Sequence, residues 1–194
     1  MKPAAIGLRI HSGWGALVAV SNGGVLEVVE RRHIIIADPA ISGSKQPYHY
    51  AENLELKKAE EYIARCSTVS RQLASRDIRE VLSRLHEYRV QGSAILMGSE
   101  RPLPSLEKIL ASHALIHMAE GWFFRMLVRK ACEDAGLTVT PLPERELVER
   151  AKKTFGEKVN QIKERISSLG KRLGPPWTQD EKLATLAAAL IVVS

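Results

Sequence analysis

The chain has 194 residues, of which 45% are hydrophobic and 26% are charged, so it is long enough to bury one ordinary globular core. Aromatic residues make up only 5%, which argues against an aromatic platform on which bases would stack. The formal net charge of +6 permits DNA or RNA as a partner without requiring either. We expect one domain over residues 1–194.

Cysteine usage and hydropathy indicate the compartment. Cys66 and Cys132 are far apart and belong to no CxxC motif, so we expect reduced thiols rather than a disulfide or a zinc site. The opening MKPAAIGLRI does not resemble a signal peptide, and LATLAAALIVV is too short to span a membrane. We therefore expect a cytoplasmic protein of bacterial type without a membrane partner. The oligomeric state is not indicated.

The first half of the chain begins with strand patterns and then turns helical. AIGLRI, ALVAVS and VLEVVERRHIIIAD predict three strands, and NGG before the third is typical of a tight hairpin. Residues 51–91 show helical spacing, as one kinked helix or as two, with Ser75 able to cap the second. SAILMG, bounded by Gly92 and Gly98, predicts a buried fourth strand.

The second half alternates between helix and strand. We expect a helix over 104–135, a strand at LTVTPL, and charged helices over 144–155 and 157–169. Thr178 and Glu181 form a T-x-x-E capping box that begins the last helix. The order predicts an α/β fold with a mixed five-stranded sheet, its first three strands an antiparallel meander, and helices on both faces.

This order, with the opening IGLRIHSGWGALVAV and the late stretch WTQDEKLATLAAAL, resembles the ribonuclease H-like superfamily. The closer likeness is to its Holliday-junction-resolvase branch. There the first strand reads like Gly-Ile-Asp-Pro-Gly, and the last helix carries an Asp ahead of an Ala/Leu run. The resemblance implies a nuclease whose carboxylates hold two divalent metals beside the scissile phosphate.

The acids that this resemblance implies are largely missing. Arg9 stands in the place of the first-strand Asp, and Leu183 stands beside Ala184 where the last helix should carry its Asp. Glu100 lies where a second acid is expected. Asp180, one turn before Leu183, is either a displaced acid or a charge that complements the helix dipole. We predict a divergent protein without ordinary two-metal nuclease activity.

The turn HSGWG has two interpretations. It is similar to the phosphate-binding turn of actin-like ATPases, in which backbone N–H groups cradle phosphate, and it is equally a plain hairpin turn. Arg9, His11, Ser12 and Asp180 are therefore candidates for lining a pocket at this end of the sheet. A smaller cluster, Tyr-His-Tyr at 48–50, either covers the sheet edge or lines a pocket.

His113, His117 and Glu120 share one face of the predicted helix over 104–135 with apolar residues, so we expect them to be buried. They form either a structural hydrogen-bond network or an acid–base or ligand site, with Glu100 as a further catalytic candidate. Two histidines four residues apart can also chelate a divalent metal, which is possible but not favoured, with a third ligand from His11 or Glu100.

Residues 144–172 contain nine Lys or Arg and five Glu, a local balance of +4. They are either a phosphate-binding stripe or a solvated helix face with Glu and Lys at stabilising spacings. The nucleic-acid-binding candidates are Lys152, Lys153, Lys158, Lys163, Arg165, Lys171 and Arg172. Three hypotheses remain open: a nucleic-acid-associated protein, a small-molecule or hydrolytic protein that uses the histidine helix, and a structural or oligomeric partner protein.

Overall fold

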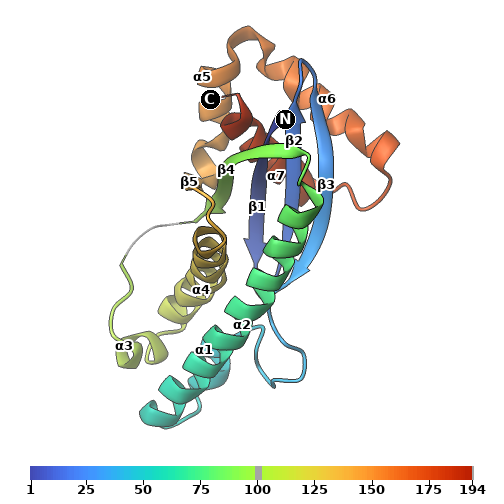
Figure 1. Ribbon diagram of the computed structural model, residues 1–194. Helices are drawn as coiled ribbons and strands as arrows, with labels where there is room; N and C mark the ends of the chain where they lie inside the picture. Colours follow the sequence, from blue (N-terminus) through green and yellow to red (C-terminus); the bar gives the residue numbers. More distant parts are fainter. Residues whose placement is uncertain (99–101, 194) are drawn as a thin grey trace.

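The computed structural model describes residues 1–98 and 102–193 and has a five-stranded sheet at its centre (Figure 1). The strands are β1 (Lys2–His11), β2 (Trp14–Asn22), β3 (Leu26–Ile35), β4 (Tyr88–Met97) and β5 (Val139–Pro143). Their order is β3-β2-β1-β4-β5, with β1, β2 and β3 antiparallel and with β4 parallel to both β1 and β5. The predicted mixed sheet and its opening meander are confirmed.

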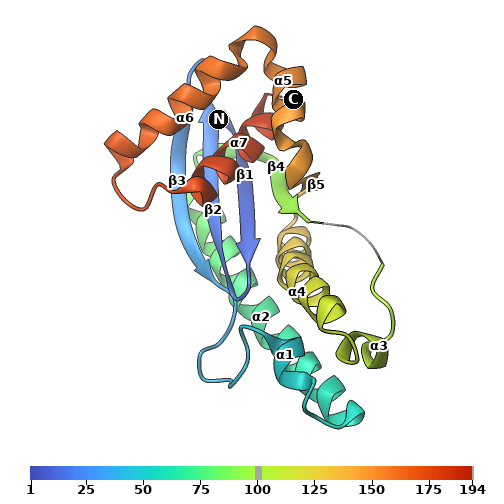
Figure 2. The same cartoon turned by 180° about the vertical axis from the view of Figure 1, so that it is seen from behind.

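Helices cover both faces of this sheet, as predicted. They are α1 (Pro47–Ala51), α2 (Leu56–Arg84), α3 (Leu106–Leu110), α4 (His113–Asp134), α5 (Leu147–Phe155), α6 (Val159–Leu173) and α7 (Gln179–Val192), with 3-10 turns η1 (Glu144–Glu146) and η2 (Gly156–Lys158). α2 and α4 lie on one face, and α7 lies on the other beneath α5 and α6 (Figures 1 and 2). Within the described ranges, no helix is both long enough and apolar enough to cross a membrane.

The alternation of side chains along β1 sets the two layers. Ile6, Leu8 and Ile10 belong to the core shared with α2 and α4, whereas Ala5 belongs to the core shared with α7. Gly7 lies on the α7 side, where an added Cβ would come within 1.8 Å of the Ala184 carbonyl oxygen. Glycine at this position therefore lets α7 pack directly on β1.

The structure decides one alternative that the sequence left open and corrects two predicted boundaries. Ser75 caps no helix, because α2 runs unbroken through it with Ala74 and Ile78 buried on one face. The helix expected over 104–135 is two helices, because Ser112 is extended (φ −141°, ψ 111°) between α3 and α4. β4 begins before Gly92, at which a Cβ would lie 2.9 Å from the Thr138 carbonyl oxygen, so the glycine marks a close approach and not a strand end.

Two local predictions are confirmed. Thr178 caps α7, and the side chain of Glu181 accepts a hydrogen bond from the Thr178 backbone N–H at 2.7 Å, which completes the capping box. Cys66 and Cys132 are buried free thiols. Burial raises the pKa of Cys132 to about 12, so this thiol stays protonated and packs as a small apolar group.

A candidate site at the strand ends and a histidine cluster

The parallel strands β1, β4 and β5 end at the same edge of the sheet, where the chain places charged side chains. Arg9 and His11 are two residues apart on β1 and share the face that α7 covers. Glu144 follows β5 directly, and Asp180 lies in the first turn of α7. Carboxyl ends of parallel strands are the usual ligand-binding edge of an α/β sheet, so this edge is a candidate site.

Arg9 is the centre of this strand-end cluster. Its Nε and Nη2 donate to the two carboxylate oxygens of Glu144 at 3.2 and 2.8 Å, and its Nη1 donates to Asp180 Oδ1. The His11 Nε2 also contacts Asp180 Oδ1, at 2.7 Å. Burial opposes ionisation of Asp180, but the hydrogen bonds and charges of His11 and Arg9 outweigh it and lower the pKa of Asp180 below its ordinary value.

The cluster does not fit two divalent cations. Glu144 and Asp180 carry two negative charges, and Arg9 cancels one of them. A divalent ion about 4 Å from the guanidinium would meet a repulsion of roughly 8 kcal/mol at an effective dielectric constant of about 20. β1 itself, KPAAIGLRIH, contains no acidic residue. Asp180 thus lies at the strand ends, where a displaced acid would lie. Its carboxylate is paired with Arg9 and His11. Glu100 lies outside the described residues.

A second guanidinium lies close to the same cluster. Arg125, on α4, lies near enough to Glu144 and Arg9 to interact with both charges. Burial is the main cause that lowers the pKa of Arg125, and the positive charge of Arg9 lowers it further. Its Nε is buried and has no hydrogen-bond partner among the described residues. The site is therefore more basic than the resemblance implies, and sequence reasoning missed Arg125 because the residue belongs to a separate helix.

The turn HSGWG is a plain hairpin turn between β1 and β2. Its Ser12 is exposed, and Gly13 has φ +80°. The Gly13 carbonyl accepts hydrogen bonds from the backbone N–H groups of Ile36 and Ala37 at 2.8 and 3.0 Å, so the turn closes the end of β3. The structure gives no support to a phosphate-binding role for this turn.

The buried face predicted for His113, His117 and Glu120 is only partly right. Glu120 is 4% exposed, but both histidines are exposed, in the first turns of α4, which have the short helices α1 and α3 as neighbours. The Nε2 atoms of His113 and His117 lie 2.9 Å apart. Glu120 Oε1 accepts hydrogen bonds from the backbone N–H groups of Tyr48 and His49 at 2.7 and 3.1 Å.

His49 is the residue that joins these histidines, whereas the expected His11 belongs to the strand-end cluster. Its ring centroid lies 4.7 Å from that of His117 and 5.4 Å from that of His113. Its Nδ1 lies 3.3 Å from Glu120 Oε1. The Tyr-His-Tyr cluster at 48–50 is thus part of α1 and packs against α4, rather than covering the sheet edge.

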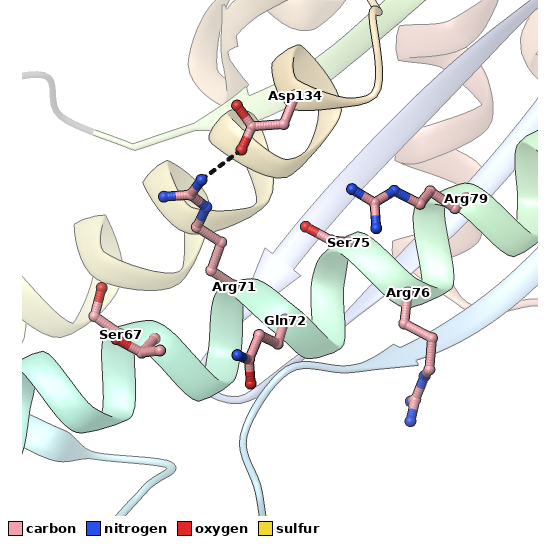
Figure 3. Close-up of a pocket in the computed structure, with 8 residues that line it drawn as sticks. Ser67, Arg71, Gln72, Ser75, Arg76, Arg79 and Asp134 are labelled. Atoms are coloured by element: carbon pink, nitrogen blue, oxygen red, sulfur yellow. Dashed lines mark ion pairs between the residues drawn. The ribbon is translucent and has the colours of Figure 1, made fainter.

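A polar groove lies between α2 and α4, and sequence reasoning missed it. Its volume is about 670 Å³. It is lined by Ser67, Thr68, Arg71, Gln72, Ser75, Arg76, Arg79 and Asp134. Arg71, Ser75 and Arg79 recur every fourth residue on one side of α2, and Arg71 reaches across to Asp134 at 2.9 Å (Figure 3). Arg79 makes no ion pair or hydrogen bond within the part of the chain that the structure describes. The sequence feature that could have revealed this groove is the spacing of arginine and serine at every fourth residue of α2.

The basic stretch 144–172 forms α5 and α6, on the outer side of α7. Lys152, Lys153, Lys158, Lys171 and Arg172 are exposed, and Lys163 is half-buried. Arg165 is different, because its Nε donates to the Leu26 carbonyl at 2.9 Å and ties α6 to the start of β3. Its role in the predicted stripe stays a prediction.

The sheet order, the two helical layers and the strand-end site together define a ribonuclease H-like fold. No protein-family model and no curated protein matches the chain. Among solved structures, Thermus thermophilus RuvC in complex with Holliday junction substrate is similar, with a TM-score of 0.50 and 13% identity over 96% of this chain and 90% of that one. A second Thermus thermophilus RuvC structure has a TM-score of 0.49 and 12% identity, over 96% and 92%.

Proposed function

We propose that this protein, as one domain, binds nucleic acid without cutting it by the two-metal reaction. The observation that carries the proposal is the ion pairing of Arg9 with both Glu144 and Asp180, which occupies the carboxylates at the strand ends with a protein cation. The shared fold supports a nucleic-acid partner, since the RuvC neighbour is described in complex with a Holliday junction. The proposed protein keeps the fold of a nucleic-acid-binding domain, and an ion pair stands at the strand ends in place of a two-metal centre.

The groove between α2 and α4 is the surface that best fits a phosphate backbone. Guanidinium, hydroxyl and amide groups all donate hydrogen bonds to phosphate oxygens, and Arg71, Ser75 and Arg79 present such groups one helical turn apart. Asp134 is the one acidic residue among those that line the groove, and Arg71 already neutralises it. A phosphate would take over the pairing of Arg71 and give Arg79 a partner.

The exposed lysines of α5 and α6 are a second candidate surface for the same function. Their charge is diluted, because Lys152 pairs with Glu149 at 3.4 Å and further glutamates are interleaved along the two helices. They also lie on the outer side of α7, on the opposite face of the sheet from the groove (Figure 2). We therefore place the main phosphate contacts on α2.

Fluorescence anisotropy with labelled single-stranded DNA, duplex DNA and a four-way junction tests the proposal. Each phosphate contact contributes about 0.9 to the slope of log K against log salt. We expect R71A/R79A to lower that slope by about 2 and to weaken binding to all three DNAs alike. The matched control is R89A, which removes one exposed arginine at the start of β4.

Three outcomes contradict the proposal. Failure of the unaltered protein to bind any of the DNAs at low salt would refute nucleic-acid binding. Equal slopes for R71A/R79A and R89A would refute the groove as its site. Magnesium-dependent cleavage of the junction, lost in D180N, would refute the claim that the ion pair has replaced the metal centre.

A further inference from the structure

Three imidazole rings converge where α1 meets the first turns of α4. His49 comes from α1, and His113 and His117 are one turn apart on α4. The centroids of His113 and His117 lie 4.4 Å apart with the rings nearly perpendicular, and His49 stands at steep angles of 81° and 68° to them. The three rings are therefore in mutual edge-to-face contact.

The nitrogen atoms of this histidine cluster have the spacing of metal ligands. One ligand nitrogen from each of the three rings lies within 4.8 Å of the others, and the Nε2 atoms of His113 and His117 are 2.9 Å apart, within hydrogen-bond distance of each other. Two imidazole nitrogens bound to one tetrahedral zinc ion, each at about 2.0–2.1 Å, are roughly 3.3 Å apart. Small rotations of exposed side chains separate the observed positions from that geometry.

Glu120 contacts the histidine cluster through His49. Its Oε1 faces Nδ1 of His49 at 3.3 Å and also holds the backbone N–H of the same residue. A carboxylate on one ring nitrogen fixes the tautomer and leaves the other nitrogen free to bind, which is the usual support of a metal-binding histidine. Glu120 Oε2 is buried and has no hydrogen-bond partner within the described residues, so hydrogen bonds account for only one of the two carboxylate oxygens.

We propose that His49, His113 and His117 bind a divalent transition-metal cation of the zinc type, with Glu120 positioning His49. Imidazole ligands suit zinc and its neighbours rather than magnesium or calcium. His113 and His117 are exposed, so three protein ligands leave at least one coordination position open to solvent or an external ligand. The site is separate from the Arg9 cluster and does not depend on nucleic-acid binding.

Zinc titration of the full-length protein by isothermal calorimetry tests the site, with cobalt absorption as a second readout of tetrahedral nitrogen ligation. We expect one ion per chain. H49A, H113A and H117A should each weaken zinc binding at least about 100-fold, and E120Q about 10–100-fold, the loss typical of a removed supporting carboxylate. H86A is the matched control, because His86 is exposed just beyond the other end of α2.

Circular dichroism of each metal-free variant establishes that the fold is kept. Zinc binding that H49A leaves unchanged would overturn the proposal, because two histidines on one helix would then suffice. Equal losses in H86A and H113A would also overturn it, as would a chain that binds no zinc at all. H113Q and H117Q repeat the test with less change in surface polarity if an alanine variant unfolds.

Discussion

Glu120 should stabilise the fold, whereas the two histidines beside it should not. Glu120→Ala leaves the backbone N–H groups of Tyr48 and His49 without their acceptor. An unpaired buried donor costs about 1–3 kcal/mol, and both groups are partly buried, so we expect the free energy of unfolding to fall by about 2–4 kcal/mol. Glu120→Gln keeps an acceptor oxygen in place and should cost about 1 kcal/mol.

His113→Ala and His117→Ala should change the free energy of unfolding by less than about 0.5 kcal/mol, because both side chains are exposed. Urea denaturation followed by circular dichroism, with a chelator present to remove metal, measures all four variants. Losses of similar size for His113, His117 and Glu120 would refute this reasoning, because they would show one shared structural network. A stable Glu120→Ala would refute it as well, since the two N–H groups would then have found other partners.

The Arg9 cluster makes Asp180 acidic, so carbon NMR titration should find its pKa below the ordinary value of about 3.9, and Arg9→Leu should raise it. Because this pKa is lowered in the folded state, the contribution of Asp180 to stability is present above about pH 4 and is lost as pH falls through the folded pKa. Thr178→Ala removes the cap of α7 and should lower the free energy of unfolding by about 0.5–2 kcal/mol in urea, with Thr178→Ser restoring most of it. Gly7→Ala should cost about 3 kcal/mol or more in thermal melting, because its methyl group would meet the Ala184 carbonyl oxygen at 1.8 Å.

Local chemistry was the part of this fold that could be predicted from sequence. The hairpin after Asn22 and the capping box at Thr178 are each decided by a few neighbouring residues, and both were found. The break at Ser112 is marked only by the serine itself, a common N-cap residue type, and neither glycine nor proline interrupts the helical pattern there. A helical pattern carried across it assigned His113 to the core. Periodicity placed His113 and His117 on one helix with the buried Glu120, but it cannot tell how far along that helix the cover of neighbouring elements extends.

The candidate site was predicted less well, because it is built from contacts between elements that are far apart in the sequence. The resemblance made Arg9 and Asp180 candidates for one site, but the sequence left open whether Arg9 points into it, and the ion pair between them is found only in the structure. The link from His49 to Glu120 joins residues 71 positions apart through the packing of α1 on α4, and no periodicity carries that information. The Tyr-His-Tyr segment was noticed, but its partners were not.

The strand-end cluster and the histidine cluster are two separate groups of polar side chains on one fold. A small cavity of about 230 Å³ is lined by both Arg125, which feels the charges of Arg9 and Glu144, and His117, which belongs to the histidine cluster. At the strand ends the positive charge comes from protein side chains, and of the three clustered histidines His117 lines this cavity. Function follows such sites and not the fold that holds them.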